Sequence, residues 1–156
     1  MTHRILFVCL GNICRSPLGE GIMRHLVRDA GLEDRIEVDS AGTGAYHAGE
    51  APDPRSREVA GKHGISLDGQ RARKVAPEDF HDFDLVLAMD QKNLEDLRAS
   101  CPPAERKRLR LMRSFDPEGG ADVPDPYFGG ASGFEDVFAM VHRCCESLLE
   151  SLVRDP

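Results

Sequence analysis

No stretch of the sequence approaches the roughly 18 consecutive apolar residues of a membrane-spanning helix, and the N-terminal segment lacks the hydrophobic region and cleavage site of a signal peptide. A surplus of positive charge is also missing, because 27 acidic residues outnumber 20 basic ones and give a formal net charge of −7. We therefore expect no attraction to nucleic acid or to an anionic membrane. Any anion that the protein binds must be held by a local arrangement of donors.

Cysteines are few, and they are not spaced as a disulfide framework. Their odd number in a chain of ordinary core size favours a reducing cytoplasm, and they stand at Cys9, Cys14, Cys101, Cys144 and Cys145. We expect the last three to be buried or partly buried thiols without a chemical role. His142 lies beside Cys144 and Cys145, but three candidate ligands crowded on one helix lack the paired spacing of a zinc site, so we expect no metal.

The length of 156 residues and the hydrophobic share of 40% fit one folded unit. A chain of this size buries roughly 70% of the surface that its unfolded form exposes. There is no internal repeat and no low-complexity segment. We predict a single domain over residues 1–156, and we expect a monomer, with a weak dimer as the alternative.

Apolar runs of strand length alternate with longer segments of helical period, which is the pattern of a parallel sheet covered by helices. Strands are predicted at residues 5–8, 36–39, 84–89 and 109–112. The first two contain Val, Ile or Phe, as buried strands do. The predicted fold class is therefore α/β.

Helices are predicted from apolar residues at spacings of three to four. The first runs through residues 17–30, with Ser16 as its N-cap, Pro17 at its first position and Gly31 as the left-handed residue after it. The other helices have predicted boundaries as well: Asp53-Pro54 begins one that ends near Gly64, Asp90 caps a third, and a Ser132/Glu135 capping box begins the last, whose apolar stripe runs from Phe134 to Leu152.

The segment Cys9-Leu10-Gly11-Asn12-Ile13-Cys14-Arg15-Ser16 joins the first predicted strand to the first predicted helix. A tight turn between a strand and a helix can direct its backbone N–H groups inward, and the helix N-terminus adds roughly half a positive charge. Gly11 and Asn12 tolerate the left-handed backbone conformations that such a turn needs. The sequence therefore predicts a phosphate-binding loop after the first strand.

Three side chains of this loop suit the transfer of a phosphoryl group. Cys9 is expected at the bottom of the loop, where the backbone dipoles and Arg15 favour the reactive thiolate. Arg15 can place its planar guanidinium over a phosphate and donate two parallel hydrogen bonds. Ser16 can donate its hydroxyl to the Cys9 sulfur, both when the thiolate attacks and when it leaves.

A thiolate that attacks a phosphate monoester also needs a proton donor for the leaving group. Residues 114–133 are rich in Gly, Pro and Asp and have no period, and loops of this length are usually functional or disordered. Within this loop Asp125 precedes Pro126, which restricts the backbone, and the aromatic residues Tyr127 and Phe128. We predict Asp125 as the general acid, then as the base that activates water. The aromatic neighbours favour a ring-shaped substrate group.

Through these residues the sequence closely resembles the low-molecular-weight protein tyrosine phosphatase family, from the first strand to the last helix. The matching motifs are Cys9-x5-Arg15-Ser16 with Asn12 inside it, Asp39-Ser40, Pro52-Asp53-Pro54-Arg55, His63-Gly64-Ile65, Met89-Asp90 and Asp125-Pro126-Tyr127. The resemblance implies three layers, with a four-stranded parallel sheet in the order 2-1-3-4 between helices on both faces. It also implies hydrolysis of phosphotyrosine through a phosphocysteine on Cys9, without a metal or another cofactor.

The resemblance assigns further residues around the site. A hydrogen-bonded network that holds the loop in shape is implied for Asn12, Glu20, Ser40 and His63, and some family members carry another histidine near Gly69 or Gln70. An aromatic cleft wall is implied for Tyr46, Tyr127 and Phe128, and His47 beside Tyr46 is a candidate for the rim. The phosphate is expected to contact the loop residues Leu10, Gly11, Asn12, Ile13, Cys14 and Ser16. The expected partners are phosphotyrosine proteins or small aryl phosphates.

Two residues of the loop leave alternatives open. Ile13 favours an aromatic phosphoester, because the related protein-arginine phosphatases carry threonine there. Cys14 is either the partner of Cys9 in a reversible disulfide, as in family members with the same pair, or a small packing residue.

Two other functions compete with this interpretation. Arsenate reductase shares the fold and the loop but relays electrons through further cysteines, and residues 80–92 contain none. A phosphate-binding module without turnover predicts the loss of the nucleophile or the acid, yet Cys9 and Asp125 are both present. The basic clusters at residues 71–74 and 106–110 are interpreted as solvated faces, with docking patches as the alternative.

Overall fold

The computed structural model describes residues 2–127 and 131–154, with side chains of the second range described from residue 133. It contains a four-stranded parallel sheet in the order β2-β1-β3-β4. The strands are β1 (His3–Cys9), β2 (Ile36–Gly42), β3 (Leu85–Ala88) and β4 (Leu109–Leu111). The predicted fold class and strand order are confirmed, and each strand overlaps its predicted range.

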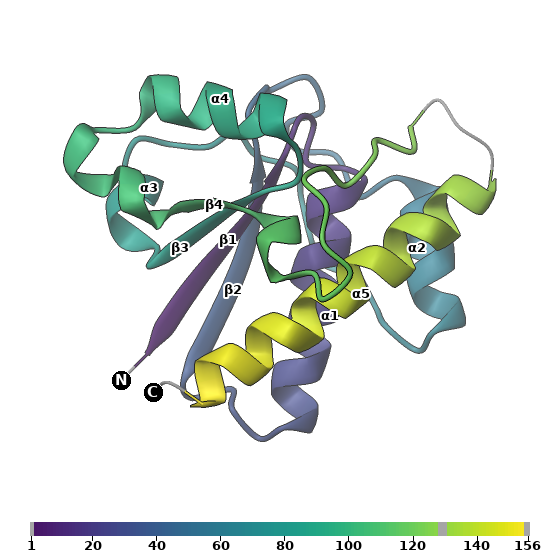
Figure 1. Cartoon of the computed structure of the whole chain (residues 1–156). Helices are drawn as coiled ribbons and strands as arrows, with labels where there is room; N and C mark the ends of the chain where they lie inside the picture. Colours follow the sequence, from purple (N-terminus) through teal and green to yellow (C-terminus); the bar gives the residue numbers. More distant parts are fainter. Residues whose placement is uncertain (1, 128–130, 155–156) are drawn as a thin grey trace.

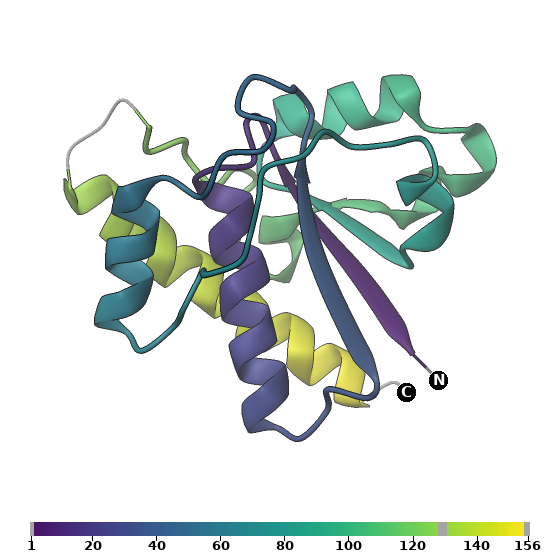
Figure 2. The same cartoon turned by 180° about the vertical axis from the view of Figure 1, so that it is seen from behind.

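Helices cover both faces of the sheet and complete three layers (Figures 1 and 2). One face carries α1 (Arg15–Asp29), α2 (Pro54–Lys62) and α5 (Ala131–Arg154). The other carries α3 (Asp79–Asp82) and α4 (Gln91–Ser100), and the short 3-10 helices η1 (Pro103–Arg108) and η2 (Met112–Phe115) flank β4. Among the described helices, none combines the length and the apolar character needed to cross a membrane.

The central strand β1 is buried on both of its faces. Ile5 and Phe7 belong to the core cluster that includes residues of α1 and α5, whereas Leu6 and Val8 belong to the cluster that includes residues of α4. This split follows from the two-residue period of a strand. All four side chains are fully buried, and each contributes roughly 1.5–3 kcal/mol of transfer free energy, so β1 is held firmly from both sides.

The order of the strands determines where a ligand can bind. The chain passes from β1 through α1 to β2 on one side of β1, and it later returns to β3 on the other side. In open α/β sheets the crevice beyond the carboxyl end of a strand at such a switch point is the usual ligand site. Residues 10–14 follow the carboxyl end of β1 and lie at this crevice.

The start of α1 differs from the prediction. The helix begins at Arg15 after Cys14, and Cys14 makes no side-chain cap hydrogen bond. Ser16 and Pro17 lie inside the first turn, so the predicted N-cap and first position are wrong. Pro17 is tolerated there because the N–H groups of a first helical turn have no acceptor within the helix. The Ser16 hydroxyl contacts the Cys9 sulfur instead.

Several other predicted helix ends agree with the structure. Gly31 follows α1 in the left-handed conformation, with φ of 69°. Both acidic caps are confirmed: Asp53 accepts a hydrogen bond from the Arg55 backbone N–H at 2.8 Å, and Asp90 accepts one from that of Asn93 at 2.7 Å. The α5 helix begins at Ala131, before the predicted start. The side chain of Ser132, half of the predicted capping box, lies outside the described residues.

Candidate active site

Residues 10–14 form a turn whose carbonyl oxygens are bonded to neighbouring segments. Three backbone N–H groups donate to carbonyls of this turn and of the residue before it: Thr43 to Cys9 at 2.9 Å, Gly44 to Leu10 at 3.0 Å and Asp53 to Ile13 at 2.8 Å. Within the described part of the chain, no group accepts a hydrogen bond from the backbone N–H groups of residues 10–14. Those N–H groups can therefore serve an anion, which is the arrangement predicted for a phosphate-binding turn.

The left-handed conformation of the turn falls on Asn12, which has φ of 57°. Gly11 does not adopt a positive φ, so the prediction of two left-handed residues is wrong for Gly11. A Cβ atom at Gly11 would lie 3.0 Å from Cδ2 of His47, so a larger residue there would have to displace the His47 ring slightly. Gly42 at the end of β2 is needed for space, since its Cβ would lie 2.7 Å from the carbonyl oxygen of Leu10.

A buried hydrogen-bond network holds Asn12 in this conformation. Its Nδ2 donates to Ser16 Oγ at 2.7 Å and to Ser40 Oγ at 3.0 Å. Its Oδ1 accepts the Arg73 backbone N–H at 3.0 Å. Ser40 in turn donates to Glu20 Oε1 at 2.6 Å. Three of the four residues predicted for this network are therefore found in it.

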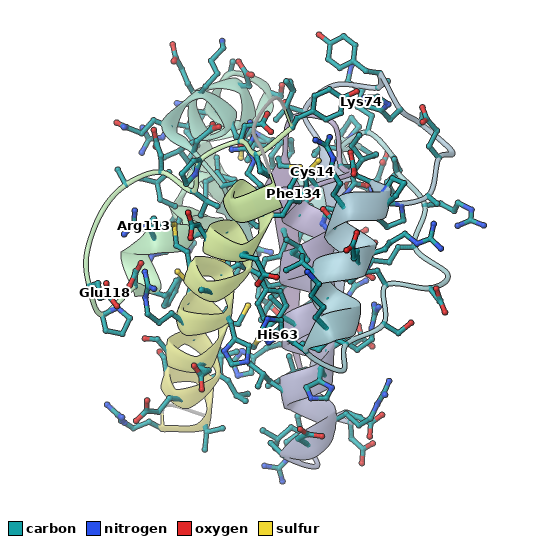
Figure 3. All side chains as sticks on the ribbon, turned by 90° about the vertical axis from the view of Figure 1, so that its right-hand side faces the viewer. Cys14, His63, Lys74, Arg113, Glu118 and Phe134 are labelled. Atoms are coloured by element: carbon teal, nitrogen blue, oxygen red, sulfur yellow. The ribbon has the colours of Figure 1, made fainter. Side chains whose placement is uncertain are left out.

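His63, the fourth, is not part of the network. Its ring stacks on Phe138 with 4.2 Å between centroids, and its Nε2 lies 3.5 Å from Glu135 Oε2. Figure 3 shows His63 low between α2 and α5, away from the turn. His63 is the C-cap residue of α2, so its position is set by the end of that helix. Gln70 contacts the start of α1 instead, because its Nε2 donates to the Pro17 carbonyl at 3.2 Å.

The Cys9 sulfur lies under the turn, and the side chain is almost fully buried. Its Sγ is 3.0 Å from Ser16 Oγ, which is the predicted contact. Ser16 Oγ accepts a hydrogen bond from Asn12, and its single hydrogen can go either to the Cys9 sulfur at 3.0 Å or to the Ala41 carbonyl at the longer distance of 3.4 Å. The arrangement can therefore stabilise a thiolate, which has no hydrogen to give.

The Arg15 guanidinium is held by three neighbouring groups. Its Nη1 donates to Asp90 Oδ2 at 2.7 Å and to the Val123 carbonyl at 2.9 Å, while its Nη2 lies 3.6 Å from Asp125 Oδ2. Burial opposes the charge on the guanidinium, but Cys9, Asp90 and Asp125 outweigh it and raise the pKa of Arg15 above its ordinary value. Arg15 is therefore a fixed cation at the edge of the site.

A cavity of about 320 Å³ opens above the turn, and it brings together most of the predicted site residues. Its lining residues are Cys9, Leu10, Gly11, Ile13, Cys14, Arg15, Tyr46, His47, Asp125 and Tyr127. Asn12 and Ser16 lie behind this lining, in the network described above. Phe128, the other predicted aromatic residue, lies outside the described residues. The predicted nucleophile, clamp and acid thus line one cavity.

The acid loop stands at the open side of this cavity. The Asp125 side chain is 41% exposed, and its Oδ1 accepts the Tyr127 backbone N–H at 3.0 Å. Tyr127 and His47 face each other across 6.2 Å between ring centroids. Tyr46 is 75% exposed, so its ring can move onto a bound group. The rim is therefore aromatic, as predicted.

Cys14 lines the same cavity, but its electrostatic setting differs from that of a reactive thiol. Burial, with the negative charge of Asp53, Cys9 and Asp125, raises the pKa of Cys14 to about 12. The five cysteines are free thiols in this structure. Cys14 is therefore a protonated thiol at neutral pH.

Three contributors to the site have roles that the sequence analysis did not assign. Asp90 orients Arg15 as well as capping α4, and Arg73 bonds to the turn from 61 positions along the chain. The side chain of Arg73 pairs with Asp39 and Asp79, so its assignment to a solvated face is wrong. Arg55 lies over the ring of Tyr127, at 5.4 Å from the centroid. Arg55 and Asp90 belong to the family motifs Pro52-Asp53-Pro54-Arg55 and Met89-Asp90, and this was the only signal for them in the sequence. Arg73 belongs to no such motif.

Comparisons with known proteins agree with this geometry. Residues 4–156 match the family described as low molecular weight phosphotyrosine protein phosphatase. The low molecular weight protein-tyrosine-phosphatase of Streptomyces coelicolor is 46% identical, and the alignment covers 97% of this chain and 94% of that protein. The human low molecular weight phosphotyrosine protein phosphatase is 41% identical, with 96% of this chain and 95% of that protein covered.

Solved structures give the same answer. The crystal structure of protein tyrosine phosphatase from Entamoeba histolytica, with Hepes in the active site, superposes with a TM-score of 0.94 at 38% identity and covers 98% of each chain. These matches span almost all of the sequence. The chain belongs to the family of low molecular weight phosphotyrosine protein phosphatases.

Proposed function

We propose that this protein hydrolyses phosphotyrosine and related aryl phosphates through a phosphocysteine on Cys9. The observation that carries the proposal is that Cys9, Arg15 and Asp125 line one cavity together with a turn whose N–H groups have no acceptor among the described residues. The dipoles of the turn and the start of α1 favour negative charge, both on the sulfur and on a bound phosphoryl group. No metal ion takes part in the steps below.

In the first step the Cys9 thiolate attacks the phosphorus, and the bond from phosphorus to the phenolic oxygen breaks. Asp125, in its protonated form, transfers its proton to that oxygen, so tyrosine leaves neutral. Nη1 of Arg15 is already bonded to Asp90 and Val123, which leaves Nε and Nη2 for two equatorial phosphoryl oxygens. These fixed donors stabilise the charge of the transition state more than that of the bound substrate.

In the second step the Asp125 carboxylate takes a proton from water, and the water oxygen attacks the phosphorus. The bond from phosphorus to sulfur breaks, and inorganic phosphate and the Cys9 thiolate are released. The Ser16 hydroxyl, 3.0 Å from the sulfur, stabilises the thiolate as it leaves. The overall reaction consumes one water and leaves the enzyme unchanged.

The rim of the cavity supports an aryl substrate. Tyr46 and Tyr127 offer ring faces for the phenyl group, and Ile13 adds an apolar wall. The partners we propose are phosphotyrosine proteins or small aryl phosphates. We further infer a single domain acting as a monomer, and the free thiols favour a reducing cytoplasmic setting.

Steady-state hydrolysis of phosphotyrosine, phosphoserine and phosphoarginine peptides, in EDTA with reductant, tests substrate class and metal independence together. We expect turnover of phosphotyrosine alone. Cys9→Ser should abolish turnover and retain binding, and Asp125→Ala should slow substrates with poor leaving groups far more than those with good ones. Equal effects on both would refute the assignment of the acid. Arsenate reduction with thioredoxin, or binding without phosphate release, would support the competing functions.

A further inference from the structure

Arg55, in the first turn of α2, connects three segments at the mouth of the cavity. Its Nε and Nη2 bond to the two carboxylate oxygens of Asp53 at 3.1 and 3.0 Å. Its guanidinium also lies near two aromatic rings, with Cζ 5.4 Å from the centroid of Tyr127 and 4.6 Å from that of Phe134. In Figure 3 Phe134 and Cys14 are labelled toward the same end of the helical layer.

The base of this arrangement is fixed to the phosphate-binding turn. The Asp53 backbone N–H donates to the Ile13 carbonyl at 2.8 Å, and Ser56 Oγ donates to the Cys14 carbonyl at 3.2 Å. Burial alone would raise the pKa of Asp53, but its hydrogen bonds with Arg55 lower it. Asp53 therefore stays a carboxylate at neutral pH and holds the guanidinium in one orientation.

The other end of the arrangement reaches the acid. Tyr127 donates its backbone N–H to Asp125 Oδ1 at 3.0 Å, so the position of Tyr127 helps to set the direction of the carboxyl group. The Asp125 side chain is 41% exposed. Val123 and Pro126 of this loop are buried, whereas Asp125 and Tyr127 are exposed, so the contact of Arg55 with the Tyr127 ring attaches the exposed part of the loop.

We propose that Arg55 is a positioning residue for the general acid: its cation–π contact holds Tyr127, and Tyr127 directs Asp125 toward the leaving group. This inference rests on the proposed role of Asp125. The Arg55 side chain is 40% exposed but that of Asp53 is only 8% exposed, so removal of the guanidinium leaves a nearly buried carboxylate without its partner and costs folding stability as well. A loss of stability lowers the activity toward all substrates alike, whereas a misplaced acid lowers it most for poor leaving groups.

The test compares kcat/KM for phenyl phosphate, a poor leaving group, with that for 4-nitrophenyl phosphate, a good one. Arg55→Met keeps an unbranched side chain and removes the guanidinium with its charge. Since a positioned general acid is worth ~10²- to 10⁴-fold, we expect the phenyl phosphate value to fall about tenfold and the 4-nitrophenyl value by less than about twofold. Arg55→Lys keeps a cation without the two parallel hydrogen bonds, and it should recover part of the loss.

Arg57→Met is the matched control, because Arg57 lies on the same helix, is exposed, and has no ion pair or cation–π contact with another described residue. We expect it to leave both values unchanged. Asp125→Ala shows the effect of losing the general acid altogether. In the pH profile of kcat/KM, the decrease at alkaline pH should become shallower in this variant. Arg55→Met should make the same alkaline decrease in kcat/KM partly shallower.

The outcomes separate the two proposals. If Asp125→Ala shows no dependence on the leaving group, the proposed function fails. If it does, and Arg55→Met lowers both substrates equally or changes neither, only the role of Arg55 is overturned. A merely structural role for Arg55 predicts equal losses and an unchanged alkaline decrease in kcat/KM.

Discussion

Asn12 gives the sharpest test of how the phosphate-binding turn is built. It is 2% exposed, it has φ of 57°, and its side chain makes hydrogen bonds to Ser16, Ser40 and the Arg73 backbone. Asn12→Gly removes the three bonds and relieves the backbone strain. Asn12→Ala removes the same bonds and keeps a Cβ in the left-handed region. The pair therefore separates the network from the strain.

The expected costs follow from these contacts. Three buried hydrogen bonds at about 1 kcal/mol each predict a loss of about 3 kcal/mol for Asn12→Gly. A left-handed alanine costs about 1 kcal/mol more, so Asn12→Ala should lose about 4 kcal/mol. Gly31→Ala calibrates the strain term alone, because Gly31 has φ of 69° and no atom lies within 4 Å of the Cβ it would gain. We expect about 1 kcal/mol there.

Urea unfolding with reductant measures these differences. The chain contains no tryptophan, so far-ultraviolet circular dichroism is the suitable signal. With a slope of about 2 kcal/mol per molar urea, the midpoint of Asn12→Gly should fall by about 1.5 M. Two results would refute the reasoning: Asn12→Gly as stable as the wild type, or Asn12→Ala no less stable than Asn12→Gly while Gly31→Ala shows its expected loss.

Further predictions concern charge and thiol chemistry. Hydrogen bonds from Arg143 and others lower the pKa of Asp116 from 3.8 to about 2, so its stabilisation is complete above pH 3.8 and is lost as the pH falls through about 2. In acid unfolding, the stability gap between the wild type and Asp116→Asn should therefore narrow between pH 4 and 2, and a constant gap would contradict this. Ser16→Ala should slow iodoacetamide alkylation of Cys9 at pH 6 about tenfold, the value of one hydrogen bond to a charged group; an unchanged rate would remove Ser16 from thiolate stabilisation. With its pKa near 12, Cys14 should be labelled far more slowly than Cys9 at neutral pH, as mass spectrometry of peptides can check. If Cys14 forms the disulfide, dithiothreitol should restore peroxide-treated wild type and not Cys14→Ser, whereas equal recovery supports a packing role.

Much of the fold could be predicted because the sheet is buried. Residues 5–9 of β1 form a continuous apolar run, since both faces of this strand meet helices. The short α3 and the 3-10 helices η1 and η2 escaped prediction, because helices of four to six residues are too short to show a hydrophobic period. The strand order came from the family resemblance, since apolar patterns indicate strands but do not say which ones pair.

Some residues of the site could likewise be predicted from the sequence and others could not. Cys9 and Arg15 could be predicted because the turn is a contiguous motif. Arg73 could not, because its backbone N–H reaches Asn12 from 61 positions away and depends on how the segment crosses the end of β2. The cap at Ser16 was predicted wrongly for a related reason. A hydroxyl at a helix start can bond to its own helix or to a neighbour, and only the tertiary structure brings the Cys9 sulfur within 3.0 Å of it.

The arrangement of Arg15 and Asp125 links substrate binding to proton loading. Nη2 of Arg15 lies 3.6 Å from Asp125 Oδ2, so a phosphoryl group bound to Arg15 comes close to the Asp125 carboxyl group. A dianion and a carboxylate at that separation repel each other, and a proton on Asp125 removes the repulsion. The dianion therefore binds best to the protonated acid, and by linkage its binding favours that proton. The first step of the proposed mechanism needs the same state, so Asp125 would serve both to exclude unproductive binding and to protonate the leaving group, in a chain with a net charge of −7.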